Sequence, residues 1–481
     1  MKRRLFSFIA AFLFVFSGLF VAGSLAPTLT SAGEPTLPIV FVHGGAGSGA
    51  QYETQAMRWA SNNYPNFVTG IDYNSLLPNS ESLYLMLDEF FDAVMAETGD
   101  SQIYALAHSR GTSLMVAYLK SSAERSARIA KYINIDGATG ANCPGNPSPV
   151  NCLGIFGQGI PGRAMGTNNV YFPDQSHTQT VTSEQSFVAQ YEYLTGKTPL
   201  TTLVLPEPPG QVEIAGKLVD FPANSGVNGG TIEIWEVHGN SGVRKDSFPM
   251  TVINIGPTGE WGPVHVNGQK YYEFATTRPD SPRITHYYRQ PFIRSDYLIR
   301  LLSSSPTSPI IINTQTGPDH SAAVLIRYKE WWSDQGAGSD TMWVTTTSPT
   351  WASNPNYPPA LNILSNPAVA PRLPIIPFSP NKIGIHAFDA GLDKVSTLAP
   401  IPFFLAQTFQ TGVDIWMPAT DPPDGTISFT NEPRGDTSRP QTVNVPNWAS
   451  DDHRVSIQFN DYVQDINTWG ECKRAKPSPC K

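Results

Sequence analysis

Short apolar runs alternate with amphipathic stretches between residues 37 and 196 of this 481-residue chain. Such alternation is typical of a mostly parallel sheet flanked by helices. The predicted strands of this small α/β domain, placed at residues 34–202, are Leu37 to His43, Val68 to Tyr73, Gln102 to Ala107, Lys131 to Ile135, Val150 to Phe156 and Asn169 to Phe172.

Two helices have clear signals in this region. Apolar side chains recur at helical spacing after the second strand, and Gly99 ends that pattern. They are Leu83, Met86, Leu87, Phe90, Phe91 and Val94. A second helix is predicted after the last strand, with a capping pattern at Thr182 and Gln185 and a stop at Gly196.

The sequence changes character after a proline-rich linker at residues 203–210, LVLPEPPG. Alternating patterns then predict an all-β region of sandwich or barrel-like modules, at residues 211–300 and 301–481. Half-buried strands are predicted at Val212 to Ile214, Thr231 to Ile234 and Val455 to Phe459, and buried strands at Pro309 to Ile312 and Ala322 to Ile326. Residues 349–380 hold nine prolines and are predicted to form a surface excursion.

Composition agrees with a turn-rich β region, because charged residues make up 15% of the chain while it holds 43 prolines and 39 glycines. The net charge of −8 argues against a nucleic-acid partner. Residues 1–32 place Lys-Arg-Arg before a long apolar run and small residues, which predicts a signal peptide and a secreted, extracellular protein. The alternative is an uncleaved segment that anchors the protein at the cell surface.

Four cysteines form two close pairs, Cys143 with Cys152 and Cys472 with Cys480. In an exported chain each pair is predicted to form a local disulfide. Neither pair has the spacing of zinc ligands, so we expect no metal site.

The stretch YALAHSRGTSL contains a candidate nucleophile, Ser109, which lies between Ala107 and Gly111 in a small-x-Ser-x-Gly pattern. A match to small-x-Ser-x-Gly is weak alone, but Ser109 falls where a predicted strand meets a predicted helix. That position is typical of a nucleophile elbow. Ala107 replaces the usual first glycine, which is tolerable where the backbone keeps ordinary dihedral angles.

A second pattern, VFVHGGAGSG, follows the first strand. Backbone N–H groups of Gly45 and of Arg110, the residue after Ser109, are the predicted oxyanion donors. His43, Gly44 and His108 are predicted to support them by orienting or packing. A glycine-rich loop after a strand can instead bind phosphate, but this loop lacks the G-x-G-x-x-G and G-K-[S/T] spacings of phosphate-binding loops.

The base and the acid are expected downstream of Ser109. His177 follows the last predicted strand, and Asp136 ends an earlier one, in the order serine, acid, histidine. His320 is a rival for the base, and Asp174 is a rival for the acid.

These residues resemble those of secreted α/β-hydrolase lipases and esterases. The likeness lies in VHGGAGSGAQYE, LAHSRGTS, YINIDG and NVYFPDQSHTQTVTSEQSF, and extends loosely over the β region. The whole chain is most similar to two-domain archaeal and actinobacterial lipases with a C-terminal β-barrel-like domain. The resemblance implies an α/β-hydrolase fold, a triad of Ser109, Asp136 and His177, oxyanion donors Gly45 and Arg110, and no cofactor.

The expected function is therefore a secreted carboxylic ester hydrolase, specifically a lipase acting on acyl glycerols through an acyl-enzyme. The alternatives are an esterase or polyester or cutin-type hydrolase with the same triad, and a non-catalytic lipid-binding or surface-binding protein. The expected partner is a lipid or ester substrate at a lipid–water interface, and we expect a monomer. Residues 46–66 and 139–166 are lid candidates, and the apolar run at residues 401–409 faces lipid or forms a buried strand.

Overall fold

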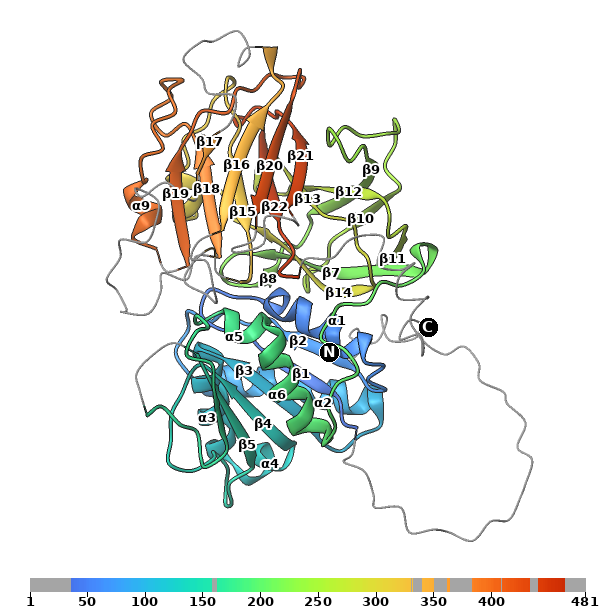
Figure 1. Ribbon diagram of the computed structural model, residues 1–481, viewed down its shortest axis with the longest axis vertical. Helices are drawn as coiled ribbons and strands as arrows, with labels where there is room; N and C mark the ends of the chain where they lie inside the picture. The colour runs from blue at the N-terminus through green and yellow to red at the C-terminus, as the bar shows by residue number, and fades with distance from the viewer. Residues whose placement is uncertain are drawn as a thin grey trace, which may run out of the picture.

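The computed structural model describes residues 36–157, 162–329, 331, 340–349, 361–363, 383–407, 409–432 and 440–462. The predicted signal peptide, the pair Cys472 and Cys480 and most of the proline-rich stretch lie outside these residues. Among the described residues, no helix is both long and apolar enough to cross a lipid bilayer. Figure 1 shows two parts, an α/β domain and a larger β region packed on it.

The α/β domain is built on a six-stranded parallel sheet with the order β2-β1-β3-β4-β5-β6. Each of the six predicted strands is confirmed to within two residues at either end. The strands are β1 (Ile39–Val42), β2 (Val68–Ile71), β3 (Ile103–His108), β4 (Ile129–Ile135), β5 (Asn151–Phe156) and β6 (Asn169–Tyr171).

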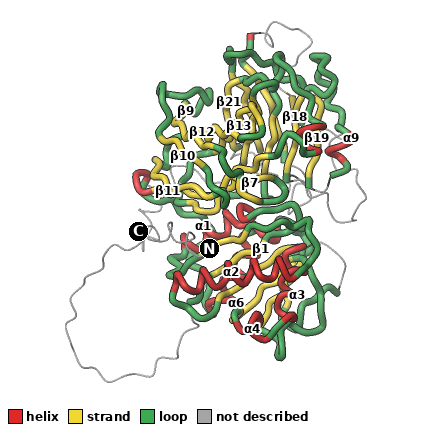
Figure 2. Tube along the Cα trace, turned by 180° about the vertical axis from the view of Figure 1, so that it is seen from behind, coloured by secondary structure: helices red, strands yellow, loops and turns green. Residues whose placement is uncertain are grey.

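Helices cover both faces of this sheet (Figures 1 and 2). Side chains of α2 and α3 pack with Val40, Ile103 and Ala105 in one core, and side chains of α1 and α6 pack with Phe41 and Leu106 in the other. The helices are α1 (Glu53–Ser61), α2 (Glu81–Thr98), α3 (Arg110–Ser121), α4 (Ala123–Ala127), α5 (Gln179–Thr182) and α6 (Glu184–Thr195), and a 3-10 turn, η1 (Gly49–Tyr52), precedes α1. Strands buried on both faces explain the nearly continuous apolar runs.

Glycines end two of these helices as predicted. Gly99 after α2 and Gly196 after α6 adopt left-handed backbone angles, with φ of 75° and 68°. The predicted cap of α6 is wrong by one residue, because Ser183 accepts the hydrogen bond from the Ser186 N–H. Thr182 instead belongs to the short helix α5.

The β region contains one eight-stranded sheet, β10-β9-β12-β13-β22-β15-β18-β19, and two four-stranded sheets. Strands before and after residue 300 join in the long sheet through the parallel pair β13 and β22. Its strands are β9 (Thr231–Val237), β10 (Thr251–Asn254), β12 (Tyr271–Arg278), β13 (Ser281–Arg289), β15 (Ala323–Ile326), β18 (Gly384–Phe388), β19 (Gln410–Asp414) and β22 (His453–Gln458).

The two small sheets pack against opposite faces of the long one. One has β7 (Val212–Asp220), β8 (Ser225–Gly226), β11 (Glu260–Val266) and β14 (Asp296–Ser303); the other has β16 (Thr341–Thr346), β17 (Leu361–Asn362), β20 (Thr426–Glu432) and β21 (Gln441–Pro446). Separate apolar cores fill the two interfaces. The described strands thus form open, sandwich-like layers, without a closed barrel among them.

Two predicted features of the β region are wrong. Residues 309–312 form a turn of helix, α7 (Pro309–Ile312), because proline suits a first helical turn and the Ser308 hydroxyl caps the Ile311 N–H. Residues 402–405 form another, α9 (Pro402–Leu405), in place of a buried strand over 401–409. Only Phe404 of α9 is fully buried.

The predicted linker is packed and not free. Val204 is buried against Met57 of α1 and Ile293 of the β region, and the Glu207 N–H bonds to the Ile293 carbonyl at 2.9 Å. A 3-10 turn, η2 (Pro209–Gln211), ends the linker.

Candidate active site

Ser109 lies at the sharp turn between β3 and α3. Its backbone angles are φ 50° and ψ −120°, a conformation that side-chain-bearing residues rarely adopt. The turn therefore stores strain where the sequence pattern places the nucleophile. Ala107, by contrast, is fully buried and is not among the residues with positive φ, so its methyl group replaces a hydrogen without backbone strain.

The turn is pressed against the loop that follows β1. A Cβ atom on Gly111 would lie 2.5 Å from the His43 carbonyl oxygen and 2.6 Å from that of Val42. A Cβ on Gly44 would lie 3.1 Å from the Cβ of Ser109. Glycine is therefore required at position 111 by the close approach of two backbones, and a side chain at position 44 would crowd those of His108 and Ser109.

The two predicted oxyanion donors lie next to each other in this contact. A Cβ on Gly45 would be 3.8 Å from the Cβ of Arg110. Arg110 is the first residue of α3, so its N–H has no carbonyl partner within the helix. Within the described part of the chain, the Gly45 N–H also has no hydrogen-bond partner. Both groups are free to bind an anion.

The structure brings Asp136 and His177 together. The ring Nδ1 of His177 lies 2.5 Å from Oδ2 of Asp136, and only 2% of the Asp136 side chain is exposed. Asp136 follows β4 directly and has a positive φ of 44°. Its second oxygen accepts hydrogen bonds from the Gly157 N–H at 3.0 Å and from Arg163 Nη1 at 2.7 Å.

These partners keep Asp136 ionised. Burial alone would raise the pKa of its carboxyl group, but the hydrogen bond and charge of His177, together with the charge of Arg163, hold that pKa below its ordinary value. A carboxylate at this position fixes the Nδ1–H tautomer of His177. Nε2 of His177 is then the basic nitrogen.

The two rival residues are placed elsewhere. His320 lies in the β region, where its Nε2 is 3.1 Å from the Ser450 hydroxyl and 3.2 Å from the Gln315 carbonyl. Asp174 is exposed, and no contact joins it to His177.

His108 supports the site through both ring nitrogens. Its Nδ1 accepts from the Gln51 side-chain amide at 2.9 Å, so its Nε2 donates to the His177 carbonyl oxygen at 3.0 Å. Burial, followed by the charge of His177, lowers the pKa of His108 well below its ordinary value, so this ring is neutral. A neutral ring can orient the backbone of His177 without competing for its proton.

His43 is likewise neutral, because burial lowers its pKa. Its Nε2 accepts from the Tyr73 N–H at 3.2 Å, so its Nδ1–H donates to the Gly44 carbonyl at 2.8 Å. This second bond fixes the backbone immediately before Gly45.

A small cavity opens at Ser109. Gly44, Gly45, Gly47, Gln51, His108 and Thr178 line it from the α/β domain, and Tyr328, Ile383 and Phe409 line it from the β region. The Phe409 ring is stacked on the His177 ring, with 6.3 Å between their centroids. The β region therefore forms part of the site, and residues 46–66, a lid candidate in the sequence, are largely buried beneath it.

Buried ion pairs join the α/β domain to the β region close to residues 46–66. Arg300 of β14 pairs with Asp72 at 2.9 Å, and Asp72 also accepts the Gly49 N–H at 2.8 Å. Arg289 of β13 pairs with Glu53 of α1. These residues, with Arg163, Asn224, Tyr328 and Phe409, were missed by sequence reasoning, since no local pattern links positions that lie so far apart in the chain.

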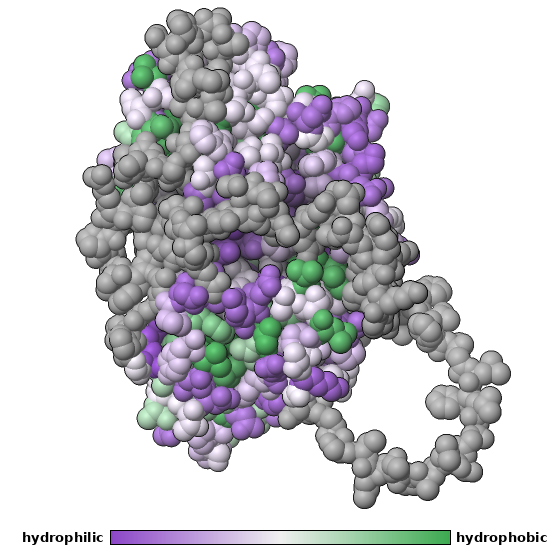
Figure 3. Space-filling view, viewed as in Figure 1, coloured by the Kyte–Doolittle hydropathy of each residue, from purple (hydrophilic) through white to green (hydrophobic). Residues whose placement is uncertain are grey.

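The other lid candidate, residues 139–166, contains Arg163 and therefore reaches the acid. The predicted bridge between Cys143 and Cys152 is present in it, with 5.7 Å between the Cα atoms. On the face of the α/β domain in Figure 3, apolar side chains gather in small groups among hydrophilic ones.

Two family models match the β region. Residues 210–306 match the model described as the lipase C-terminal domain, and residues 310–463 match one described as "-like, C-terminal domain". No curated protein matches the chain.

Solved structures with some likeness include a Listeria innocua gene product, at 12% identity and a TM-score of 0.28 over 34% of this chain and 96% of its own. An α/β serine hydrolase without a lid from Xanthomonas campestris has 15% identity and a TM-score of 0.26, covering 36% of this chain and 88% of its own. A Bacillus licheniformis lipase in propeptide form has 10% identity and a TM-score of 0.25, covering 86% of this chain and 93% of its own.

TM-scores this low indicate nothing about the function of this chain. The informative features are the geometry at Ser109 and the similarity of residues 210–306 to a lipase domain. A parallel α/β domain with this site, followed by a region similar to the lipase C-terminal domain, supports a hydrolase of the lipase or esterase kind.

Proposed function

We propose that the protein is a secreted serine carboxylic ester hydrolase, specifically a lipase that cleaves acyl glycerols. The observation that carries this proposal is the strained conformation of Ser109, φ 50° and ψ −120°, at a strand-to-helix turn that opens into a cavity. Strain of this kind persists where the surrounding structure enforces it, and it is found preferentially at functional sites.

In the proposed reaction, His177 Nε2 takes the proton of the Ser109 hydroxyl as Oγ attacks the ester carbonyl. Asp136 accepts the Nδ1–H of His177 and stabilises the imidazolium that forms. The N–H groups of Gly45 and Arg110 bind the developing oxyanion, aided by the positive end of the α3 dipole. The protonated His177 then donates its proton to the departing alcohol, and a water molecule hydrolyses the acyl-enzyme by the same steps. No cofactor takes part.

Two observations favour a lipid ester over other esters. Residues 210–306 are similar to a domain found in lipases. Aromatic and aliphatic side chains of the β region, Tyr328, Ile383 and Phe409, form the outer wall of the cavity at Ser109. Such a wall suits an acyl chain, since burial of apolar surface supplies most of the binding free energy.

The test compares Ser109→Ala with Ser113→Ala on nitrophenyl esters. Ser113 is exposed on α3, so Ser113→Ala controls for the loss of a serine hydroxyl from the same helix away from the cavity. We expect Ser109→Ala to abolish turnover with an unchanged circular dichroism spectrum, and Ser113→Ala to keep wild-type activity. A folded Ser109→Ala protein that retains most activity would contradict the proposal.

A fluorophosphonate probe separates the enzyme from a non-catalytic lipid-binding protein. Labelling at Ser109, identified in the tryptic peptide by mass spectrometry, supports the enzyme, and absence of labelling supports the binding protein. Rates on emulsified long-chain triglyceride, compared with short soluble esters and with a polyester film, then separate a lipase from an esterase or a cutin-type hydrolase.

A further inference from the structure

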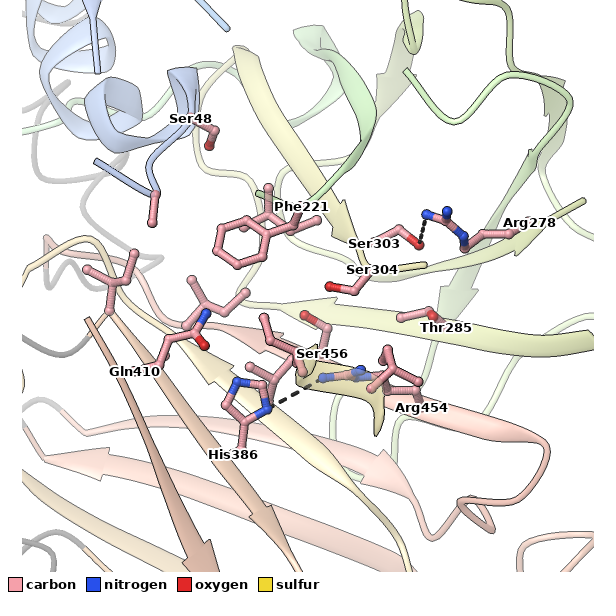
Figure 4. A pocket seen from close by; sticks show the side chains of 18 of the residues that line it. Ser48, Phe221, Arg278, Thr285, Ser303, Ser304, His386, Gln410, Arg454 and Ser456 are labelled. Atoms are coloured by element: carbon pink, nitrogen blue, oxygen red, sulfur yellow. Dashed lines mark hydrogen bonds between the residues drawn. The ribbon is translucent and has the colours of Figure 1, made fainter. Parts of the chain in front are cut away.

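A second, larger cavity adjoins the one at Ser109. Gly47, Tyr328 and Ile383 line both cavities, so the two lie side by side. Figure 4 shows its wall, built mainly by the long sheet and closed by Phe221, Ser303 and Ser304. Most of its exposed lining is apolar.

The strand register orders the side chains along this cavity. Ile326 of β15 lies level with Gly384 of β18, next to Ile383 at the catalytic end. Val324 lies level with His386 and Ser456, farther from that end.

Arg454 continues the series on β22, where it is level with Thr285 of β13. It lies four residues beyond the level of Ile326, about 13 Å along the strands. The cavity thus runs from the nucleophile, over an aliphatic floor, to a cationic end.

Two of the three arginines that line this cavity have no ion pair among the described residues. None of the lining residues in the described part of the chain is an aspartate or a glutamate. Arg278 pairs with Asp220 at 2.9 Å and with Asp280 at 2.9 Å. Arg283 and Arg454 have no ion pair within the described residues; the Arg283 guanidinium donates to the Asp451 carbonyl oxygen at 3.3 Å.

His386 adds a neutral donor beside Arg454. Arg454 Nη2 lies 3.5 Å from His386 Nδ1 (Figure 4), so the ring proton is at Nε2. This buried Nε2 has no hydrogen-bond partner among the described residues. Burial lowers the pKa of Arg454 to about 10, so its side chain stays charged at neutral pH although desolvation disfavours the charge.

A half-buried cation without an ion pair and a buried donor without a hydrogen-bond partner both cost free energy unless an anion meets them. The aliphatic side chains beside them, Val324 and Ile326, fit an apolar chain better than a small, fully hydrated anion. We propose that this cavity is a binding site for a long-chain amphiphile with an anionic head, whose head group contacts Arg454, Arg283 and His386 and whose chain extends toward Ser109.

A fatty-acid carboxylate is the head group that we assign. That choice rests on the proposed function, because ester hydrolysis at Ser109 would produce such an acid beside the adjoining cavity. Binding of the acid does not require ester hydrolysis. The binding site and the hydrolase activity can therefore be tested, and can fail, independently.

The test is calorimetric titration of the full chain with palmitate. We expect saturable binding, with hexadecanol and acetate at least tenfold weaker, because the first lacks the charge and the second lacks the chain. Arg454→Gln should weaken palmitate binding about tenfold or more, whereas Arg454→Lys keeps most of it. Lys270→Gln, which removes one positive charge from the β region away from the cavity, should have no effect.

The proposal is overturned if wild-type protein does not bind palmitate, or if hexadecanol binds as tightly. It is also overturned if folded Arg454→Gln binds palmitate like the wild type. Should Arg454→Gln fail to fold, Val324→Phe serves instead, because it narrows the floor without touching a charge and should reduce palmitate binding. Hexadecyl phosphate binding more tightly than palmitate would overturn the carboxylate and assign the site to phosphate-headed lipids.

Discussion

The side-chain amide of Asn224, in the β region, donates a 2.7 Å hydrogen bond to the carbonyl oxygen of Gly47 in the loop after β1. The same amide reaches the Tyr73 carbonyl at 3.1 Å and His43 Nε2 at 3.3 Å. Gly47 lies two residues after Gly45, a proposed oxyanion donor. The β region therefore holds the loop on which the proposed chemistry depends.

Asn224→Gly tests this link without straining the backbone, because Asn224 has a φ of 60° that glycine adopts freely. We expect kcat/KM for a short nitrophenyl ester to fall about tenfold, since loss of one buried hydrogen-bonding partner costs about 1–3 kcal/mol. Asn63→Gly is the matched control, because Asn63 is exposed and has a φ of 54°. Equal rates for the two variants would show that the loop needs no support from the β region.

Arg163 is expected to act as a positioning residue for Asp136. Arg163→Gln removes the cation that opposes the effect of burial, so the pKa of Asp136 should rise. A protonated Asp136 cannot accept the His177 N–H, so activity should fall more at about pH 5 than at about pH 8. Rate profiles against pH measure this difference. Arg128→Gln serves as the control, because Arg128 pairs with the exposed Asp92 and not with Asp136. An unshifted acid limb would contradict the role.

The pair of Asp72 and Arg300 should dominate the stability of the domain interface. Both side chains are about as buried as the core, at 2% and 3% exposure. Asp72→Asn leaves the arginine without its principal partner, which should lower the free energy of unfolding by about 3–5 kcal/mol. Thermal unfolding measures the loss. Asp92→Asn, on a pair whose carboxylate is 54% exposed, should change stability by about 0–1 kcal/mol.

The same pair predicts the direction of the pH dependence. Burial would raise the pKa of Asp72, but Arg300 and Lys217 hold it below its ordinary value. A carboxyl group whose folded pKa is depressed stabilises the fold fully above its unfolded value, about 3.9, and loses that contribution as the pH falls through the folded value. Unfolding temperature should therefore decline at acidic pH, and Asp72→Asn should reduce the decline.

Gly111→Ala should destabilise the α/β domain although alanine favours helices. Its Cβ would meet the carbonyl oxygens of His43 and Val42 at 2.5 Å and 2.6 Å, and neither backbone group can move without displacing β1. We expect a cost of about 3 kcal/mol, measured by denaturant unfolding. Gly210→Ala is the control, because nothing lies within 4 Å of its Cβ position. A Gly111→Ala protein of wild-type stability would refute the close packing of loop and elbow.

Local patterns were sufficient for the α/β domain. Alternation of buried strands and amphipathic helices identified the sheet, and glycines marked two helix ends, because these signals depend on residues close in sequence. The order of Ser109, Asp136 and His177 also followed from strand ends, and the structure joins the last two directly. The failures were short apolar runs at residues 309–312 and 401–409, where a proline at the first helical turn outweighed the apolar pattern.

The sequence by itself determined the strands, the elbow around Ser109 and the glycines that let two loops approach. Only the tertiary structure decided that Asn224 and Arg300 anchor the loop after β1, that Phe409 stacks on His177, and that Arg454 closes the adjoining cavity. The physical reason is that backbone conformation is set by neighbours within a few residues, whereas a contact between distant residues depends on how whole sheets pack. No short pattern in the β region carries that information.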